Sequence, residues 1–286
     1  DKLKARIVGG GDQQDRSLYK DLSAPTVSTT SFFSVAGIAA AENRKVISLD
    51  VGVAYLNAAM DGTVIVHMSI DPALSAVLVD LDPTYRPFLD YKGMLVVALD
   101  KALYGCIESA NLWYKNISAT LIGGGYVSNP VDPCVFNKTG PTGTQCTLAL
   151  HVDDILATSA DAALIEEFVD LIHRTYHQYT VQEGPVLGHL GMTLDYRVPG
   201  QVSITMEGCV QTLMSAYDPQ DTAVTPATSE LFVTREPDAP GNRLATPAEH
   251  KKDRSALAVC LYMAKRTYPQ LGCAVAFLTT RVNQWS

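Results

Sequence analysis

Two adjacent aspartates interrupt an otherwise apolar segment, LALHVDDILATS, at residues 148–159. A carboxylate that is buried or half-buried lowers stability unless it is paired or binds a metal ion. Asp153 and Asp154 therefore restrict this segment to two interpretations. Either the first strand ends in a solvated turn, which is the commoner outcome for a lone Asp-Asp pair, or the turn carries a metal site.

The alternation of side chains along a strand bears on this choice. In residues 145–153, one face carries bulky apolar side chains, while the other carries small or polar ones and ends in Asp153. Residues 44–51 divide in the same way, with Leu49 on the apolar face and Asp50 on the other. If these two strands are neighbours, Asp50 and Asp153 converge on one open face.

Asp50, Asp153 and Asp154 would repel one another at such a face. At about 4 Å and an effective dielectric constant of about 20, each like-charge pair costs roughly 4 kcal/mol. A divalent cation removes this cost, and oxygen ligands in a wet cleft suit Mg²⁺ best. The matching position of Asp50 thus favours a magnesium site, although alternation alone does not establish that the two strands are adjacent.

Strands alternate with helices through the first two thirds of the chain, which predicts an α+β fold with helices packed on one face of an open sheet. Capping hydroxyls, terminal glycines and apolar residues at helical spacing predict the helices. The expected elements are a helix at 28–43, a strand at 44–52, a helix at 109–126, strands at 145–152 and 155–159, and an amphipathic helix at 161–177. The first helix is expected to bury Phe32, Val35, Ala36, Ala39 and Ala40.

The remaining segments are less regular. Between residues 53 and 105, two expected strands, TVIVHMSI and GMLVVAL, are joined by a loop rich in Asp and Pro. KARIVGGGDQQD, residues 4–15, predicts a short strand and a glycine turn, which we favour over a phosphate-binding loop because no GxGxxG or GxxxxGK[ST] pattern is present. Beyond a Pro-, Thr- and Asp-rich stretch at 196–256, a second helical unit is expected from near Arg254.

Charge and cysteine usage limit the class of protein. The formal net charge is −8, whereas nucleic-acid-binding proteins more often carry a basic excess, although a cleft can be basic within an acidic chain. Six scattered cysteines without a CxxC pair argue against structural zinc and indicate reduced thiols in an intracellular protein. His173 and His177 have the spacing of a helical zinc pair, but without HExxH a solvated helix face is favoured.

Targeting signals are not visible in the sequence. No apolar run is long enough to span a membrane, and no signal peptide precedes the first strand. The chain starts at Asp1 without Met, so we expect it to be a piece of a longer protein.

Seven segments, in order and with matching spacing, resemble the reverse transcriptase of copia-type LTR retrotransposons. They are KARIV (4–8), LDVGVAYLNA (49–58), KALYG followed by WY (101–105 and 113–114), NPVDPCVF (129–136), HVDDILATS (151–159), LGM (190–192) and LYMAKRTYPQLGCAVAFLTTR (261–281). One such match is weak, but seven in order are specific to this family. The resemblance covers nearly the whole chain.

The resemblance implies a right-hand polymerase in which an antiparallel palm sheet packs on helices. The implied fingers are residues 1–28 and 59–105, the palm is 29–58 and 106–195, and the thumb or connection is 196–286, leading towards an RNase H domain that this sequence does not include. The implied function is that of an RNA-directed DNA polymerase, a nucleotidyltransferase of a retroelement Pol polyprotein. The implied partners are dNTPs and an RNA or DNA template with a primer, with no membrane, and oligomers with itself or with other Pol products are left open. The expected location is the cytoplasm, with an intracellular particle or the nucleus as alternatives.

The resemblance also assigns site residues. Asp50, Asp153 and Asp154 match the catalytic carboxylates, which bind two Mg²⁺ ions (Mn²⁺ as a substitute) with the carbonyl of Val51. One ion activates the primer 3′-hydroxyl for in-line attack on the α-phosphate, and the other neutralises the triphosphate and the leaving pyrophosphate. The implied substrate contacts are Lys4 and Arg6 at the triphosphate, Tyr55 at the deoxyribose, Tyr104 beside the incoming base and His151 near the primer end.

Several positions depart from the family pattern. His151 replaces the usual Tyr before Val-Asp-Asp, and Gly10, Ile107 and Asn111 stand where basic residues are usual. Phosphate neutralisation supplies much of the affinity for a template and primer. A decayed or co-opted copy that binds nucleic acid or protein without polymerising is therefore the alternative function, and the intact Asp50, Asp153 and Asp154 oppose it. A palm-type enzyme acting on free nucleotides is a further alternative, against which the matches outside the palm argue.

Overall fold

The computed structural model describes residues 6–217, 219, 222–233 and 246–282. The chain divides into two compact units. The first comprises Asp1–Ser31 and Arg44–Val181, and the second comprises Phe32–Asn43 and Gln182–Ser286. Each unit mixes helices with antiparallel strands, which confirms the predicted α+β class.

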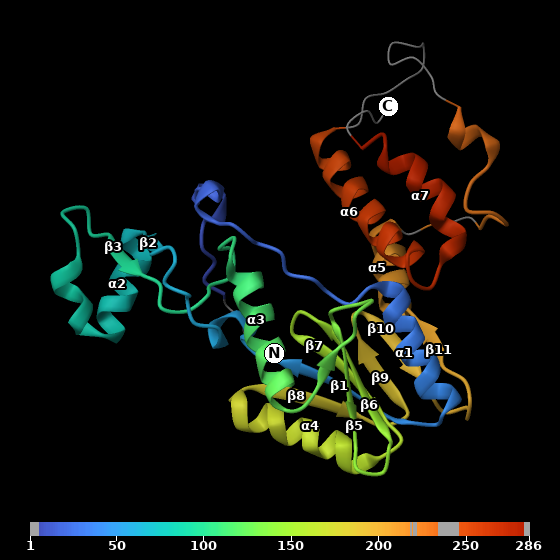
Figure 1. Ribbon diagram of the computed structural model, residues 1–286. Coiled ribbons are helices and arrows are strands. Elements are labelled where there is room, and N and C mark those ends of the chain that lie inside the picture. Colours follow the sequence, from blue (N-terminus) through green and yellow to red (C-terminus); the bar gives the residue numbers. More distant parts are fainter. Residues whose placement is uncertain (1–5, 218, 220–221, 234–245, 283–286) are drawn as a thin grey trace. The chain divides into compact units, whose positions relative to one another are not determined.

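The first unit is built on a six-stranded sheet with the order β4-β5-β6-β7-β1-β8 (Figure 1). The strands are β1 (Lys45–Val51), β4 (Val127–Ser128), β5 (Val135–Thr139), β6 (Gln145–His151), β7 (Asp154–Ser159) and β8 (Tyr179–Glu183). From β4 to β1, neighbouring strands run antiparallel. β7 lies between β1 and β6. The strand that carries Asp50 (β1) and the strand that leads to Asp153 (β6) are therefore not neighbours, so the adjacency under which Asp50 and Asp153 would converge is not found.

Two helices cover one side of this sheet. α3 (Ser109–Gly123) contacts β4, and α4 (Ala162–Thr175) contacts β7. The two helices also meet each other, since the Thr120 hydroxyl of α3 lies 3.0 Å from the hydroxyl of Tyr176, which follows α4. They therefore lie on the same side, as expected from the alternation of strands and helices.

Both faces of β1 are buried along most of its length. Ile47, Leu49 and Val51 are fully buried on the apolar face, as predicted. On the other face, however, Val46 and Ser48 are each only 6% exposed. The expected open face is therefore wrong for most of the strand, and it opens only at its end, where Asp50 is partly exposed.

A small hairpin with a helix interrupts the first unit between β1 and α3. β2 (His67–Ile70) pairs antiparallel with β3 (Leu95–Ala98), and α2 (Pro72–Leu81) lies between them in the sequence. The expectation of a loop between these two strands is therefore wrong, because the connection contains α2. The Asp71 side chain accepts hydrogen bonds from the N–H groups of Ala73 and Leu74, and proline at the first helical position needs no N–H partner, so Asp-Pro here starts a helix.

Among its described residues, the second unit contains a three-stranded antiparallel sheet and four α-helices. The sheet has the order β11-β10-β9, formed by β9 (Val186–His189), β10 (Met192–Asp195) and β11 (Ser203–Thr205). The helices are α1 (Thr29–Ala41), which joins this unit from Phe32 onward, α5 (Glu207–Tyr217), α6 (Pro247–Ala264) and α7 (Gly272–Thr279). α1 buries the five predicted side chains, and its Phe32 ring stacks on His189 with centroids 5.4 Å apart.

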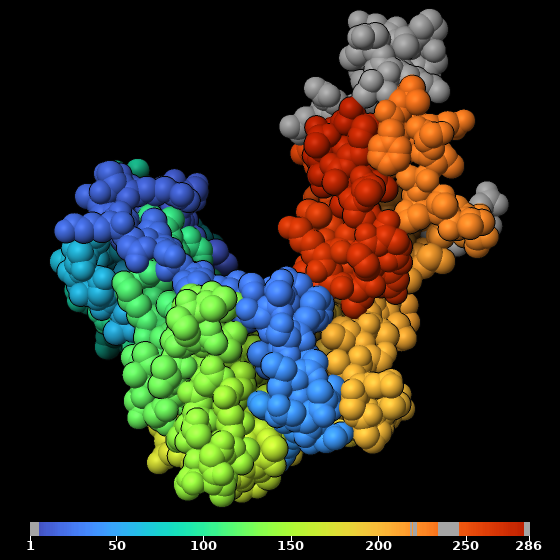
Figure 2. Space-filling model, turned by 45° about the vertical axis from the view of Figure 1, so that its right-hand side comes forward, coloured from blue at the N-terminus to red at the C-terminus, as the bar shows by residue number. Residues whose placement is uncertain are grey.

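α6, the first helix of the last helical segment, begins earlier than expected from the sequence. α6 starts at Pro247 rather than near Arg254 because Thr246 and Glu249 form a capping box, in which each side chain bonds the backbone N–H of the other. α6 and α7 pack against each other, and Figure 2 shows them as one continuous red body. Among the described helices, none combines the length and apolar character needed to cross a bilayer. The six cysteines are all free thiols.

Candidate functional site

The three aspartates lie at one end of the sheet in the first unit. β1 ends on Asp50 and Val51, β7 begins at Asp154, and Asp50 lies directly opposite Asp154 in the antiparallel pairing. On the other side of β7, His151 lies opposite Asp154. Because directly opposite residues share a face of a sheet, His151, Asp154 and Asp50 form one row across three strands.

Asp153 stands in the two-residue turn that joins β6 to β7. Its carbonyl oxygen accepts a hydrogen bond of 2.9 Å from the N–H of Val51 at the end of β1. The turn is therefore tied to β1 on one side. The structure thus brings Asp50, Asp153 and Asp154 together at the backbone level, with Asp154 rather than Asp153 as the direct partner of Asp50.

Two β-branched residues beside the aspartates have positive φ angles. Val152, in the turn, has φ 58°, and Val53, just after β1, has φ 49°. A positive φ in the first position of a two-residue turn matches the twist of the flanking strands. For valine, however, this conformation is strained by roughly 1–3 kcal/mol, and strain of this kind clusters at functional sites. The backbone around the aspartates is therefore held in place by its surroundings.

Negative charge accumulates at this end of the sheet. Burial, followed by the charges of Asp153 and Asp50, raises the pKa of Asp154 to about 6. Burial and the charge of Asp153 also raise the pKa values of Tyr55 and Tyr104. The charges of Asp153 and Asp50 are thus close enough to Asp154 to oppose its ionisation.

The donor set of this cluster suits a hard divalent cation. All three side chains offer carboxylate oxygens, and burial together with the charges of Asp153 and Asp50 raises the pKa of Asp154. Within the described ranges, no three His, Cys, Asp or Glu side chains meet at the spacing of a complete metal site. The predicted magnesium site therefore fits the residues but stays a prediction.

Arg6, Tyr104 and Tyr55, which were predicted to contact the nucleotide, form a stack. The Arg6 guanidinium lies 4.9 Å from the centroid of the Tyr104 ring, and that centroid lies 4.6 Å from the centroid of the Tyr55 ring. Tyr55, in the short helix η3 (Ala54–Asn57), is partly buried. Lys4 lies outside the described residues.

The glycines before this stack allow a close approach of two backbones. The N–H of Gly9 donates to the carbonyl of Tyr104 at 2.7 Å. Gly105 has φ 95°, and a Cβ atom there would collide with the carbonyl of Gly9. Residues 6–8 form no strand, contrary to expectation, because they run against this loop rather than along a sheet. The glycine turn thus serves backbone packing.

A buried glutamate, which the sequence analysis missed, fastens the same N-terminal segment. Glu108, only 6% exposed, accepts hydrogen bonds from the Gln14 side-chain amide at 3.0 Å and from the Tyr19 hydroxyl at 3.0 Å. Gln14 in turn accepts from the N–H of Ile107. Burial and the bond to Glu108 raise the pKa of Tyr19 to about 12. The local sequence offers no signal for this network because its members are some 90 residues apart.

Two further positions differ from their expected surroundings. Asn111, which stands where the family usually has a basic residue, is buried and donates to the Ser23 carbonyl, so it supports the fold rather than a nucleic-acid surface. α4 ends at Thr175, so His177 lies beyond it and the helical zinc pair with His173 does not form. His173 instead lies 3.1 Å from the Tyr179 hydroxyl.

Comparison with known proteins identifies the family. A family model described as reverse transcriptase (RNA-dependent DNA polymerase) matches residues 1–214. The chain belongs to the reverse transcriptase family. Among curated relatives, this reverse transcriptase chain is 24% identical over 194 residues to the retrovirus-related Pol polyprotein from transposon TNT 1-94 of Nicotiana tabacum, and 29% identical over 280 residues to that from transposon RE2 of Arabidopsis thaliana. These relatives confirm the resemblance to copia-type reverse transcriptases.

The reverse transcriptase chain is much shorter than these relatives. The matches cover 68% and 96% of this chain but only 13% and 17% of the respective polyproteins. Among solved structures, telomerase from Candida albicans in complex with a TWJ fragment of telomeric RNA is similar, with 11% identity over 91% of this chain and 47% of that chain. The TM-score of this match is 0.37.

Proposed function

We propose that this chain is an RNA-directed DNA polymerase that transfers deoxynucleotides to the 3′-hydroxyl of a primer paired with an RNA or DNA template. The observation that carries the proposal is the pairing of Asp50 with Asp154 across β1 and β7, with Asp153 in the adjoining turn. Membership of the reverse transcriptase family supports it. Three carboxylates at one end of the sheet bring negative charge together, and a divalent cation offsets repulsion of this kind.

Asp50, Asp153 and Asp154 would bind two Mg²⁺ ions, or Mn²⁺ in their place, together with the carbonyl of Val51. When bound, the ions supply activation of the 3′-hydroxyl and neutralisation of the triphosphate. The protein's own contribution is to hold these oxygens on a strained, hydrogen-bonded backbone. His151, in the same row, would contact the primer end as a hydrogen-bonding or stacking group.

The stack of Arg6, Tyr104 and Tyr55 would bind the incoming nucleotide. Arg6 is exposed and can donate charge-assisted hydrogen bonds to a triphosphate, with Lys4 as a second cation. Tyr104 would flank the base. Tyr55 is held against Tyr104, so its ring would exclude a ribose 2′-hydroxyl.

The division into fingers (1–28 and 59–105), palm (29–58 and 106–195) and thumb (196–286) belongs to the same proposal. Residues 246–282, within the proposed thumb, contain six basic and two acidic residues in a chain whose net charge is −8. A basic segment in an otherwise acidic chain fits contact with the phosphates of a template and primer. The six basic residues are Lys251, Lys252, Arg254, Lys265, Arg266 and Arg281.

Primer extension on an RNA template tests the proposal. The chain should extend the primer in Mg²⁺ or Mn²⁺, and Asp153→Asn should abolish the extension. Asp80→Asn on the exposed surface of α2 makes the same change in charge and should leave extension intact. Extension that survives Asp153→Asn would remove the assigned role of the carboxylates.

A non-polymerising copy is the second candidate. The acidic net charge and the buried, uncharged Asn111 at a position where the family usually has a basic residue favour it. Binding of template and primer without incorporation in either metal would support this candidate over the polymerase.

A further inference from the structure

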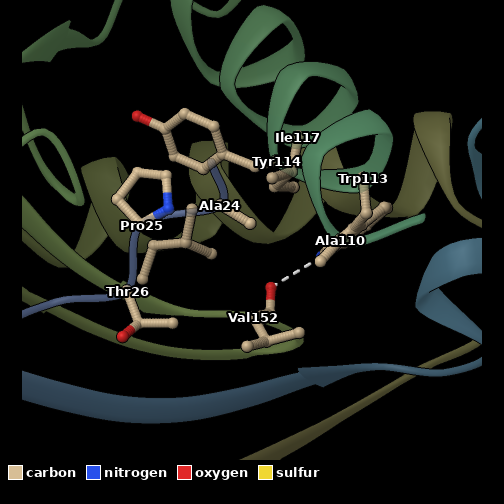
Figure 3. Close-up of a pocket in the computed structure, with 9 residues that line it drawn as sticks. Ala24, Pro25, Thr26, Ala110, Trp113, Tyr114, Ile117 and Val152 are labelled. Atoms are coloured by element: carbon tan, nitrogen blue, oxygen red, sulfur yellow. Dashed lines mark hydrogen bonds between the residues drawn. The ribbon is translucent and has the colours of Figure 1, made fainter. Parts of the chain in front are cut away.

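Trp113 contacts the turn that carries Asp153. Its indole N–H donates a hydrogen bond of 2.7 Å to the carbonyl oxygen of Val152, shown as the dashed line in Figure 3. Val152 is the residue with φ 58°, and the next carbonyl, that of Asp153, accepts from the N–H of Val51. Two consecutive carbonyls of the turn are thus each held by a hydrogen bond, that of Asp153 by β1 and that of Val152 by α3.

The indole ring is itself held firmly. Trp113 is 1% exposed, and the Tyr176 ring packs edge-on against it with centroids 5.4 Å apart. Tyr176 is also buried, and its hydroxyl donates to the side-chain oxygen of Asn116 at 2.8 Å. The donor that reaches Val152 is therefore anchored to α3 and to the chain that follows α4.

Packing beside the turn is incomplete on this side. A small cavity, partly open to solvent, lies beside Trp113 and Val152. Figure 3 shows that Pro25 and Ala110 border it together with Tyr114. A fully packed wall would fix the turn by shape alone. The hydrogen bond from Trp113 therefore adds a directional restraint on Val152 beside this cavity.

We propose that Trp113 is a positioning residue of the active site, whose indole N–H holds the strained Val152 turn and thereby sets the positions of Asp153 and Asp154. The inference rests on the proposed polymerase function. The role requires the N–H group and not merely an aromatic ring. Removing the N–H would let the turn relax towards the cavity, and displacement of a catalytic group by about 1 Å can lower a rate by about a hundredfold.

Replacement of Trp113 by 3-benzothienylalanine tests the role directly. This analogue has the shape of tryptophan but carries sulfur in place of the N–H, so packing on Tyr176 is kept. The chain has two tryptophans, so a Trp285→Phe background confines the analogue to position 113. Ile117→Val is the matched control, because Ile117 is fully buried in α3 and lines the same cavity but makes no bond to the turn.

Two measurements are made on each protein. The first is steady-state primer extension, where the analogue should lower kcat by about 10- to 100-fold and leave the KM for dNTP within about threefold, as expected when alignment rather than binding is lost. The second is hydrogen exchange of the Val51 amide, which bonds the turn and should exchange about tenfold faster or more. Ile117→Val should change neither quantity.

Each outcome is decisive. Unchanged kcat with the analogue overturns the proposal, and so does a lower kcat without faster exchange of Val51, because the effect would then not pass through the turn. If the unmodified chain extends no primer, the proposed function fails. In that case the exchange of Val51 still decides whether Trp113 holds the turn.

Discussion

Asp154→Asn should stabilise the metal-free protein at neutral and alkaline pH, although it removes a carboxylate assigned to catalysis. Burial and the charges of Asp153 and Asp50 raise the pKa of Asp154 from 3.8 to about 6. The folded state thus holds the proton more tightly than the unfolded chain does. The contribution of Asp154 to stability is complete below about pH 4 and is lost as the pH rises through about 6.

The size of the effect follows from the pKa. A rise from 3.8 to about 6 corresponds to roughly 3 kcal/mol, at about 1.4 kcal/mol per pH unit. The carboxylate is partly exposed, so solvent screening reduces this figure to about 1–2 kcal/mol. At pH 8 in EDTA, the free energy of unfolding of Asp154→Asn should exceed that of the unchanged protein by this amount. At pH 4 the carboxyl is neutral, so the two proteins should be equally stable.

Urea unfolding of both proteins at the two pH values measures the difference. Addition of Mg²⁺ at pH 8 should stabilise the unchanged protein and reduce the advantage of the variant, because a cation offsets the same repulsion. Asp80→Asn, which changes an exposed side chain, serves as the control and should shift neither curve. If Asp154→Asn is less stable than the unchanged protein at pH 8 without metal, the carboxylates do not strain one another and the reasoning is refuted.

Two further variants test other parts of the site. Tyr55→Val should raise the ratio of rNTP to dNTP incorporation by about 10-fold or more, since it removes the ring proposed to meet the 2′-hydroxyl. Primer extension with each class of nucleotide measures this ratio. An unchanged ratio would argue against the role of Tyr55. Glu108→Ala should lower the free energy of unfolding by about 2–3 kcal/mol because it leaves the partly buried donors of Gln14 and Tyr19 without their acceptor. Glu108→Gln should recover part of the loss, and equal losses in the two variants would contradict a hydrogen-bonding role.

Local patterns predicted the main elements well. The helices α1, α3 and α4 and the strands β1, β6 and β7 lie within about three residues of the expected bounds, because hydrophobic periodicity depends on neighbours in the sequence. α2 was not expected, because Asp-Pro is a common loop signal, whereas here Asp71 caps a helix that begins at Pro72. The start of α6 was also expected too late, since the capping box at Thr246 precedes the apolar residues whose spacing predicts the helix.

The sequence predicted which residues belong to the site but not which of them touch. The motifs identified six residues, and the structure adds the pairing of Asp50 with Asp154 and the contacts of Tyr104 with Tyr55 and Arg6. The six residues are Arg6, Asp50, Tyr55, Tyr104, Asp153 and Asp154. Glu108 could not be found, because a glutamate before a helix is common and its burial depends on Gln14 and Tyr19, far away in the sequence. Trp113 belonged to a recognised motif, but its bond to Val152 spans 39 residues.

Periodicity, turn chemistry and motifs are local properties, so the amino-acid order was enough to predict the α+β class, the family and the three aspartates. The order of the strands came from the folded chain, in which β7 lies between β1 and β6, so that Asp50 faces Asp154 and the turn is held by Val51 and Trp113. Strand order depends on how distant segments pair and pack. The alternation along a single strand specifies which face a carboxylate occupies, but not which strand lies beside it.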